Sequence, residues 1–310
     1  MTPWTRPDKA IPLSSEPPPL SSEPPPLRSE PPPLRSEPPP LRSELTSARA
    51  PRVQAARRLA KRAFRIRDRR FLAEGPQCVR EALATGAGVR EVFVTAEAVA
   101  RHGDLLASAT AAGAPLQQVS GEVMALIAQT VTPQGIIAVC DLLDADLATV
   151  LDRRPTLVTV LAQVRDPGNA GTVIRASDAA GADAVVLTDA SVDVYNGKCV
   201  RATAGSLFHL PVVAGVPVAE LVESLHHAGL RVLAADGAGK IDLDDAIDDG
   251  LLRRPTAWLF GNEAWGLPEE VRNLADRVIR VPIHGRAESL NLATAATVCL
   301  YASARAQRRP

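Results

Sequence analysis

Residues 156–181 read TLVTVLAQVRDPGNAGTVIRASDAAG, and this stretch sets the pattern for most of the chain. Its first nine residues form a mainly apolar run, which is typical of a strand buried on both faces. Asp166 and Pro167 indicate a turn, and the residues that follow favour a helix. A strand that leads into a helix in this way is the repeating unit of a parallel sheet covered by helices.

The same alternation continues to the end of the chain. Helices are expected between the strands, and a long final helix is expected to bury a stripe that includes Leu292, Ala296 and Leu300. Five further apolar runs predict strands: 182–189 (ADAVVLTD), 209–215 (HLPVVAG), 230–236 (LRVLAAD), 256–261 (TAWLFG) and 277–283 (RVIRVPI).

A smaller α/β unit precedes this series. Helices are predicted over 77–84, 96–112 and 122–128, and residues 144–155 are predicted to be a connecting segment. The predicted strands are 71–75 (FLAEG), 91–96 (EVFVTA), 116–120 (LQQVS) and 135–140 (GIIAVC). The chain therefore divides into two predicted α/β domains, residues 48–143 and 154–310, behind a tail of residues 1–47.

The tail consists largely of a repeat. Residues 13–44 repeat a seven-residue unit, LSSEPPP or LRSEPPP, and 15 of the 27 prolines lie in residues 1–47. Proline removes a backbone donor and clashes with the preceding helical turn, so three prolines per unit exclude a coiled coil. Trp4 is the only aromatic residue in this stretch, which leaves little to bury. We predict a disordered, proline-rich tail.

The composition excludes several classes of protein. The 310 residues are 46% hydrophobic and 23% charged, which is typical of a globular protein and not of a fibrous or fully disordered one. No apolar run approaches the roughly 18 to 20 residues of a membrane helix. The first residues do not resemble a secretory signal. Four widely spaced cysteines offer neither metal-ligand spacing nor a disulfide framework. We expect a soluble, cytoplasmic protein without a metal.

The net charge of zero hides a strongly basic stretch. Residues 49–70 contain ten arginines and lysines and one acidic residue, Asp68, a local charge of +9. A basic helix is predicted over 53–63. Two interpretations stay open for it: a solvated leader helix, or a surface that contacts the phosphates of a nucleic acid.

Three loops follow predicted strands and hold unusual residues. In open parallel sheets, ligands bind beyond the carboxyl ends of the strands. The first loop follows the strand that ends at residue 164 and leads into the next predicted helix. The second is GNEAWGLPEE (261–270), and the third is PIHGRAESLNLATAA (282–296). Taken singly, each is also explained by turns and helix caps. None carries a dinucleotide or Walker fingerprint, which disfavours a dehydrogenase or a kinase. His284 has no nucleophile beside it and is expected to be a surface histidine.

Together, the loops form a recognisable set. The segments DPGNAGTVIRA (166–176), GNEAWGL (261–267) and PIHGRAESLNLATA (282–295) resemble, in this order, the three signature motifs of the SpoU/TrmH family of RNA ribose 2′-O-methyltransferases, which belongs to the SPOUT class. KCVRATAGSLFHLPVV (198–213) resembles the middle region of that family. Upstream, RRFLAEGPQCVREAL (69–83) and VTPQGIIAV (131–139) resemble its small RNA-substrate-binding domain.

The resemblance implies a fold, a cofactor and a partner. The catalytic α/β domain of this family has its C-terminal segment threaded into a trefoil knot, which binds S-adenosylmethionine mainly through main-chain groups and needs no metal. The matching cofactor positions are Gly261, Val281 and Leu290. The family forms homodimers in which each site borrows residues from the partner. The matching functional side chains are Asn169, Arg175, Glu263, Ser289 and Asn291.

The residue types suit methyl transfer to a ribose hydroxyl. Arginine is not a base at neutral pH, so our hypothesis is that Arg175 grips the phosphate beside the target ribose and orients it to accept the proton. Glu263 would orient Arg175 or Asn169, and Ser289 and Asn291 would position the ribose or the main chain. The chain departs from the family's usual residues at Ser177, near Ala180, and at Ala264 and Trp265. For Trp265, stacking on a base and plain packing both stay open.

The expected substrate is 23S ribosomal RNA, because a substrate domain precedes the catalytic one. The expected RNA contacts are Arg57, Arg58, Lys61, Arg62 and Arg65. Three alternatives stay open: a transfer-RNA methyltransferase, a resistance-type methyltransferase that protects ribosomes from an antibiotic, and a non-catalytic RNA-binding protein with the same fold.

Overall fold

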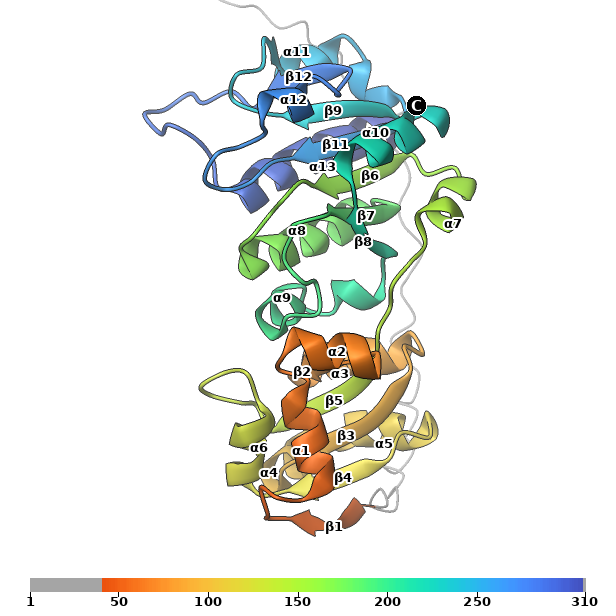
Figure 1. Ribbon diagram of the computed structural model, residues 1–310, viewed down its shortest axis with the longest axis vertical. Helices are drawn as coiled ribbons and strands as arrows, with labels where there is room; N and C mark the ends of the chain where they lie inside the picture. Colours follow the sequence, from red (N-terminus) through yellow and green to blue (C-terminus); the bar gives the residue numbers. More distant parts are fainter. Residues whose placement is uncertain (1–40, 309–310) are drawn as a thin grey trace, which may run out of the picture. The chain divides into compact units, whose positions relative to one another are not determined.

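The computed structural model describes residues 41–308, which belong to one compact unit, and contains two β-sheets (Figure 1). In the figure the first sheet is coloured orange to yellow-green, and the second green to blue. Within the described residues, no helix is long and apolar enough to cross a membrane. The predictions for residues 1–40 lie outside the described part of the chain.

The first sheet is mixed. Its strand order is β1-β4-β3-β5-β2, and β5 runs antiparallel to both of its neighbours while β1, β4 and β3 are parallel. The strands are β1 (Leu41–Leu45), β2 (Arg70–Glu74), β3 (Val89–Val94), β4 (Leu116–Val119) and β5 (Ile136–Asp141). The helices are α1 (Pro51–Arg58), α2 (Arg62–Asp68), α3 (Pro76–Ala84), α4 (Ala96–Arg101), α5 (Gly103–Ala111) and α6 (Gly121–Ile127).

Three sequence predictions for this region were wrong in detail. The tail was extended too far, because Leu41–Leu45 form an edge strand on β4. This last copy of the repeat lacks the prolines, so its backbone donors are free to pair. The predicted helix 53–63 is broken after Arg58, and the predicted helix 96–112 is broken at His102, which caps α4 and precedes α5.

The second sheet is parallel throughout, in the order β10-β12-β9-β11-β6-β7-β8. Its strands are β6 (Leu157–Leu161), β7 (Ala184–Thr188), β8 (Val212–Val216), β9 (Arg231–Ala235), β10 (Ile241–Asp242), β11 (Thr256–Phe260) and β12 (Arg277–Arg280). The helices and 3-10 turns are α7 (Leu147–Asp152), α8 (Pro167–Ala180), α9 (Gly197–Ala202), η1 (Ser206–Phe208), α10 (Val218–His227), α11 (Leu243–Asp248), η2 (Leu251–Arg253), α12 (Glu269–Arg272) and α13 (Leu292–Arg308).

The central strands of this sheet are buried on both faces, as their apolar runs predict. Leu157 and Leu161 of β6 belong to the hydrophobic cluster that includes α8 and α13, while Val158 and Val160 belong to the cluster that includes α10. Alternate side chains of a strand point to opposite faces. Residues 144–155 connect the two sheets, as predicted, and also contain the short helix α7. Asp146 caps this helix by accepting a hydrogen bond from the Thr149 amide (3.0 Å).

Helices α8 and α13 are held firmly against the sheet and α9. A side chain at Gly171 would overlap the carbonyl of Cys199, so α8 and α9 approach each other closely. On α13, Ser303 is buried and accepts a hydrogen bond from the indole nitrogen of Trp258 in β11 (2.8 Å). Both helices begin at the carboxyl edge of the sheet, where the three sequence motifs lie.

All four cysteines are buried and free, which leads to a first prediction. Burial raises the pKa of Cys78 to about 11 and those of Cys199 and Cys299 to about 12, and also raises the pKa of Cys140. Because the thiolate is the reactive form, the folded protein at pH 8 should leave Ellman's reagent unreacted, and the protein in urea should expose four thiols.

The same shifts give a pH dependence of stability. A thiol whose pKa is higher in the folded protein than in the unfolded chain, where it is about 8.5, stabilises the folded state below about pH 8.5. This stabilisation is lost as the pH rises toward the pKa of the folded state. The thermal midpoint should therefore fall between pH 8 and pH 10. Rapid labelling of one thiol in the folded protein would contradict this description of the core.

Candidate active site

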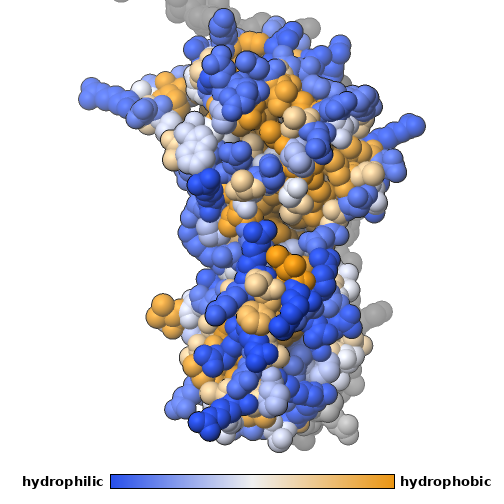
Figure 2. All heavy atoms as spheres, in the orientation of Figure 1, coloured by the Kyte–Doolittle hydropathy of each residue, from blue (hydrophilic) through white to orange (hydrophobic). Residues whose placement is uncertain are grey.

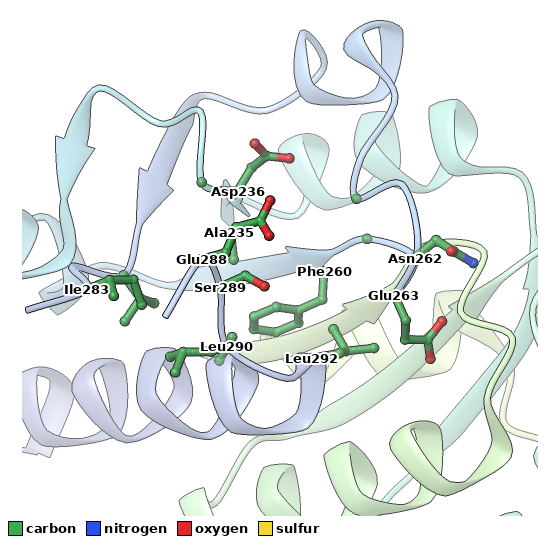
Figure 3. Close-up of a pocket in the computed structure, with 15 residues that line it drawn as sticks. Ala235, Asp236, Phe260, Asn262, Glu263, Ile283, Glu288, Ser289, Leu290 and Leu292 are labelled. Atoms are coloured by element: carbon green, nitrogen blue, oxygen red, sulfur yellow. The ribbon is translucent and has the colours of Figure 1, made fainter. Parts of the chain in front are cut away.

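A pocket of about 310 Å³ lies where the loops after β9, β11 and β12 meet. In Figure 3, Glu263 lies at one end of it and Ile283 at the other, with Phe260 and Ser289 between them. It is lined by Ala235, Asp236, Gly237, Phe260, Gly261, Asn262, Glu263, Gly266, Val281, Ile283, Glu288, Ser289, Leu290, Leu292 and Ala295. The carboxyl edge of a parallel sheet is where such folds bind ligands.

The three positions predicted to bind the cofactor, Gly261, Val281 and Leu290, all line this pocket. A β-carbon at Gly261 would overlap the carbonyl group of Gly266, so the backbone here forms a cradle that no other residue fits. Asp236 also lines the pocket, and sequence reasoning missed it. The sequence feature that could have identified it is a carboxylate directly after a buried strand.

Glu263 links the first two motifs. Its Oε1 atom accepts hydrogen bonds from the Asn169 side-chain amide (3.2 Å) and from the Asp166 backbone amide (3.3 Å). Its Oε2 atom accepts one from the backbone amide of Arg165 (3.4 Å). The carboxylate therefore lies over the start of α8, where the backbone amides and helix dipole favour negative charge.

Asn291 links the third motif to the same group. Its side-chain nitrogen donates to the Oδ1 atom of Asn169 (3.1 Å), and its own Oδ1 caps α13 by accepting from the Ala293 amide (2.9 Å). Asn169, Glu263 and Asn291 thus form one hydrogen-bonded chain. We call these three residues the polar cluster.

Asp166 fixes the start of α8 below this cluster. It caps the helix by accepting from the Asn169 backbone amide (2.8 Å) and pairs with Lys198 of α9 (2.7 Å). The Lys198 hydrogen bond, and then the helix amide, hold the pKa of this carboxyl below its usual value. Sequence reasoning missed Lys198, because nothing in its local sequence indicates a partner on another helix.

The other two predicted functional side chains lie differently. Ser289 is exposed and lines the pocket. Arg175 is exposed on α8, six residues beyond Asn169, or about 9 Å along the helix axis. Within residues 41–308, no ion pair or hydrogen bond joins Arg175 to the polar cluster. The predicted orientation of Arg175 by Glu263 is therefore absent within one chain, whereas the orientation of Asn169 by Glu263 is present.

The predicted RNA contacts divide into two groups. Four of them are exposed: Arg57 and Arg58 on α1, Lys61 directly before α2, and Arg62 on α2. Hydrophilic residues cover much of the surface in this region (Figure 2). Arg65 is instead 3% exposed and donates to the carbonyls of Leu59 and Ala60 (2.7 and 2.9 Å) and to Asp193. Arg65 is therefore a structural residue that closes the break between α1 and α2, and the RNA contact predicted for it was wrong.

The local charge of +9 is also partly neutralised. Six of the ten cations have a carboxylate within 4 Å: Arg52, Arg62, Arg65, Arg67, Arg69 and Arg70. Among the described residues, no ion pair reaches Arg49, Arg57, Arg58 or Lys61.

Within residues 41–308, no group of three or more His, Cys, Asp or Glu side chains is arranged to hold a metal.

Comparison with known proteins identifies the family. A model of the SpoU rRNA Methylase family matches residues 156–301, and a model of the MRM3-like substrate binding domain matches residues 50–138. The 23S rRNA (guanosine(2553)-2′-O)-methyltransferase RlmP of Bacillus subtilis is 34% identical over 81% of this chain and 94% of its own length. The chain belongs to the SpoU rRNA methylase family.

Solved SpoU-family structures share the fold. An AdoMet-bound rRNA methyltransferase from Sinorhizobium meliloti aligns with a TM-score of 0.72 and 31% identity, over 86% of this chain and 98% of that one. The SpoU methyltransferase AviRb of Streptomyces viridochromogenes, in complex with the cofactor AdoMet, aligns with a TM-score of 0.71 and 31% identity, over 82% and 98%. The expected family is confirmed.

Proposed function

We propose that this protein transfers a methyl group from S-adenosylmethionine to the 2′-hydroxyl of a ribose in 23S ribosomal RNA. The observation that carries the proposal is the polar cluster, which joins the three motifs beside a pocket that contains Gly261, Val281 and Leu290. The name of the RlmP relative supports both the ribose oxygen as the acceptor and 23S rRNA as the substrate.

The pocket suits S-adenosylmethionine. Gly261 brings bare backbone to the pocket wall, while Val281 and Leu290 supply apolar surface and main-chain groups for the adenosine part. When bound, this cofactor supplies an electrophilic methyl group on a sulfonium. Two AdoMet-bound relatives share the fold. We propose that no metal takes part.

The side chains around the pocket position the ribose. Since a ribose hydroxyl is a very weak acid, its proton must leave as the new bond forms. Glu263 fixes the Asn169 amide and Asn291 fixes its carbonyl oxygen, so the cluster presents polar groups of defined orientation. Ser289, on the loop between β12 and α13, would contact the ribose. Arg175 would hold the adjacent phosphate, which accepts the proton.

A homodimer would bring Arg175 to this cluster. On α8, Thr172, Arg175 and Ala179 are exposed at spacings that place them on one helix face. The neighbouring face of α13 leaves Val298 and Tyr301 39% and 50% exposed. A hollow of about 300 Å³ beside Thr172 and Val298 also reaches Asn169 and Asn291. This face of α8 and α13 we call the dimer face.

We propose that two copies pair through the dimer face, so that the polar cluster of one subunit receives Arg175 of the partner subunit. A two-fold interface is self-complementary, and each copy would supply one arginine and receive one. We further propose that the segment between β12 and α13 is threaded as a trefoil knot, since it lines one pocket with the loops after β9 and β11.

The two sheets define the proposed division of labour. Residues 48–143 would bind RNA and residues 154–310 would carry out the transfer, which agrees with the two family models that match.

An enzyme that modifies ribosomal RNA acts where ribosomes are made, so we propose a cytoplasmic location.

RNA binding by α1 and α2 gives a second prediction. Replacing Arg57, Arg58 and Lys61 together by glutamine should weaken 23S rRNA binding and reduce the salt slope of log K by about 2 to 3, because each lost phosphate contact removes about one released counterion. Filter binding between 50 and 300 mM salt measures this. The control replaces Arg101, Arg153 and Arg253, which are exposed elsewhere. Equal slopes for both triple variants would contradict the assignment.

The function itself is tested with purified protein, labelled S-adenosylmethionine and protein-free RNA. We expect label in 23S rRNA and none in transfer RNA. Calorimetric binding of S-adenosylmethionine without transfer to any RNA would instead indicate a non-catalytic RNA-binding protein, and label in transfer RNA would reassign the substrate.

A further inference from the structure

Trp265 lies in the loop of the second motif, two residues from Glu263. It is 49% exposed, whereas Trp258 is fully buried. One exposed apolar side chain is common on protein surfaces and does not by itself indicate a binding site. The position of Trp265 is the informative feature, because the loop that carries it also supplies the carboxylate of the polar cluster and part of the pocket wall.

The loop holds Trp265 in a fixed place without burying it. The Asn262 amide donates to the Gly266 carbonyl (3.0 Å) and the Gly266 amide donates back to the Asn262 carbonyl (2.9 Å), which closes the loop. The Asn262 side chain donates to the carbonyl of Gln163 (2.8 Å), which ties the loop to the end of β6. Gly266 adopts a positive φ of 68° to complete the turn.

Arg165 lies over the indole ring. Its guanidinium carbon is 5.0 Å from the ring centroid, which is cation–π geometry, and its backbone amide donates to Glu263. Arg165 is exposed, and within residues 41–308 no carboxylate pairs with it. An open aromatic surface and an unneutralised guanidinium therefore stand together at the edge of the polar cluster.

Trp265 is absent from the residues that line the cofactor pocket, although Glu263 and Gly266 on either side of it line that pocket. Its side chain therefore lies outside the lining of the proposed S-adenosylmethionine site. Proteins that bind single-stranded nucleic acid combine aromatic rings, on which bases stack, with cations that hold the backbone.

We propose that Trp265 and Arg165 form a platform for the RNA substrate, on which a nucleobase next to the target ribose stacks against the indole ring while Arg165 holds a neighbouring phosphate. This inference rests on the RNA methyltransferase function proposed above. The platform presents the ribose to the polar cluster, and it selects RNA in which that base is unpaired or turned out of its helix.

The test compares Trp265→Ala with Trp265→Phe. For Trp265→Ala, kcat/KM for 23S rRNA should fall about 5- to 100-fold, mainly through KM, because one base loses its stacking partner. Trp265→Phe should stay within about 3-fold of the wild type, because a π-face is retained. The dissociation constant of S-adenosylmethionine should be unchanged in both variants. Arg165→Gln should reduce the salt slope of RNA binding by about 1.

Fluorescence provides a readout that needs no turnover. Titration with 23S rRNA should quench tryptophan emission in the wild type, and Trp265→Phe should lose most of that quenching. A normal RNA KM in Trp265→Ala, or weakened S-adenosylmethionine binding in that variant, would overturn the inference. A wild-type protein that quenches with RNA but methylates none would overturn the proposed function and leave the platform standing.

Discussion

Replacing Arg175 by alanine is expected to reduce methyl transfer by about 1,000-fold or more. In the proposed mechanism, both the positioning of the phosphate and the removal of the proton depend on its guanidinium. S-adenosylmethionine should still bind with wild-type affinity, because Arg175 lies outside the pocket. Single-turnover kinetics and calorimetry measure the two quantities. Arg153→Ala is the matched control, because Arg153 is exposed and lies just before β6, at the edge of the sheet opposite the motif loops. An active Arg175→Ala enzyme would contradict the proposed mechanism.

The proposed dimer gives a sharper expectation for the same residue. When inactive Arg175→Ala and inactive Glu263→Ala proteins are mixed and allowed to exchange subunits, each mixed dimer has one site with an intact Glu263 and the partner subunit's Arg175. About a quarter of the wild-type activity should return, since about half of the dimers are mixed and each has one intact site. If no activity returns while mixed dimers are detected, both residues act within one subunit.

Replacing Gly261 by alanine is expected to weaken S-adenosylmethionine binding by more than about 10-fold, because the new β-carbon would overlap the backbone of Gly266 and force the loop to move. The polar cluster would shift with it, because Glu263 is on the same loop, so transfer should also fall. Calorimetry measures the affinity. Gly121→Ala, at the start of α6 beside the first sheet, is the matched control, because a β-carbon there meets open space. Unchanged affinity in Gly261→Ala would place the cofactor elsewhere.

The central strands of the second sheet were predictable because they are buried on both faces and are therefore mostly apolar. In β6, β7 and β11 the apolar runs mark the strands directly. The first sheet was predicted less completely. Its edge strand β1 reads LRSEL, with three of five residues exposed, so its pairing with β4 depends on a partner about 75 residues away and not on local pattern.

The functional residues were likewise predictable only in part. Resemblance to the SpoU family pointed to Asn169, Glu263 and Asn291, which are separated by 94 and 122 residues but meet because parallel strands end at one edge of the sheet. The burial of Arg65 was not predictable. Its partner, Asp193, is 128 residues away, and a run of ten cations gives no sign of which one turns inward.

The central claim is tested most directly by digesting 23S rRNA, after reaction with the purified protein and labelled S-adenosylmethionine, to nucleosides and identifying the labelled product by mass spectrometry. The structure predicts one 2′-O-methylated nucleoside in the wild-type reaction and none with Glu263→Ala. A label on a base, or equal labelling by Glu263→Ala, would contradict ribose methylation at the polar cluster.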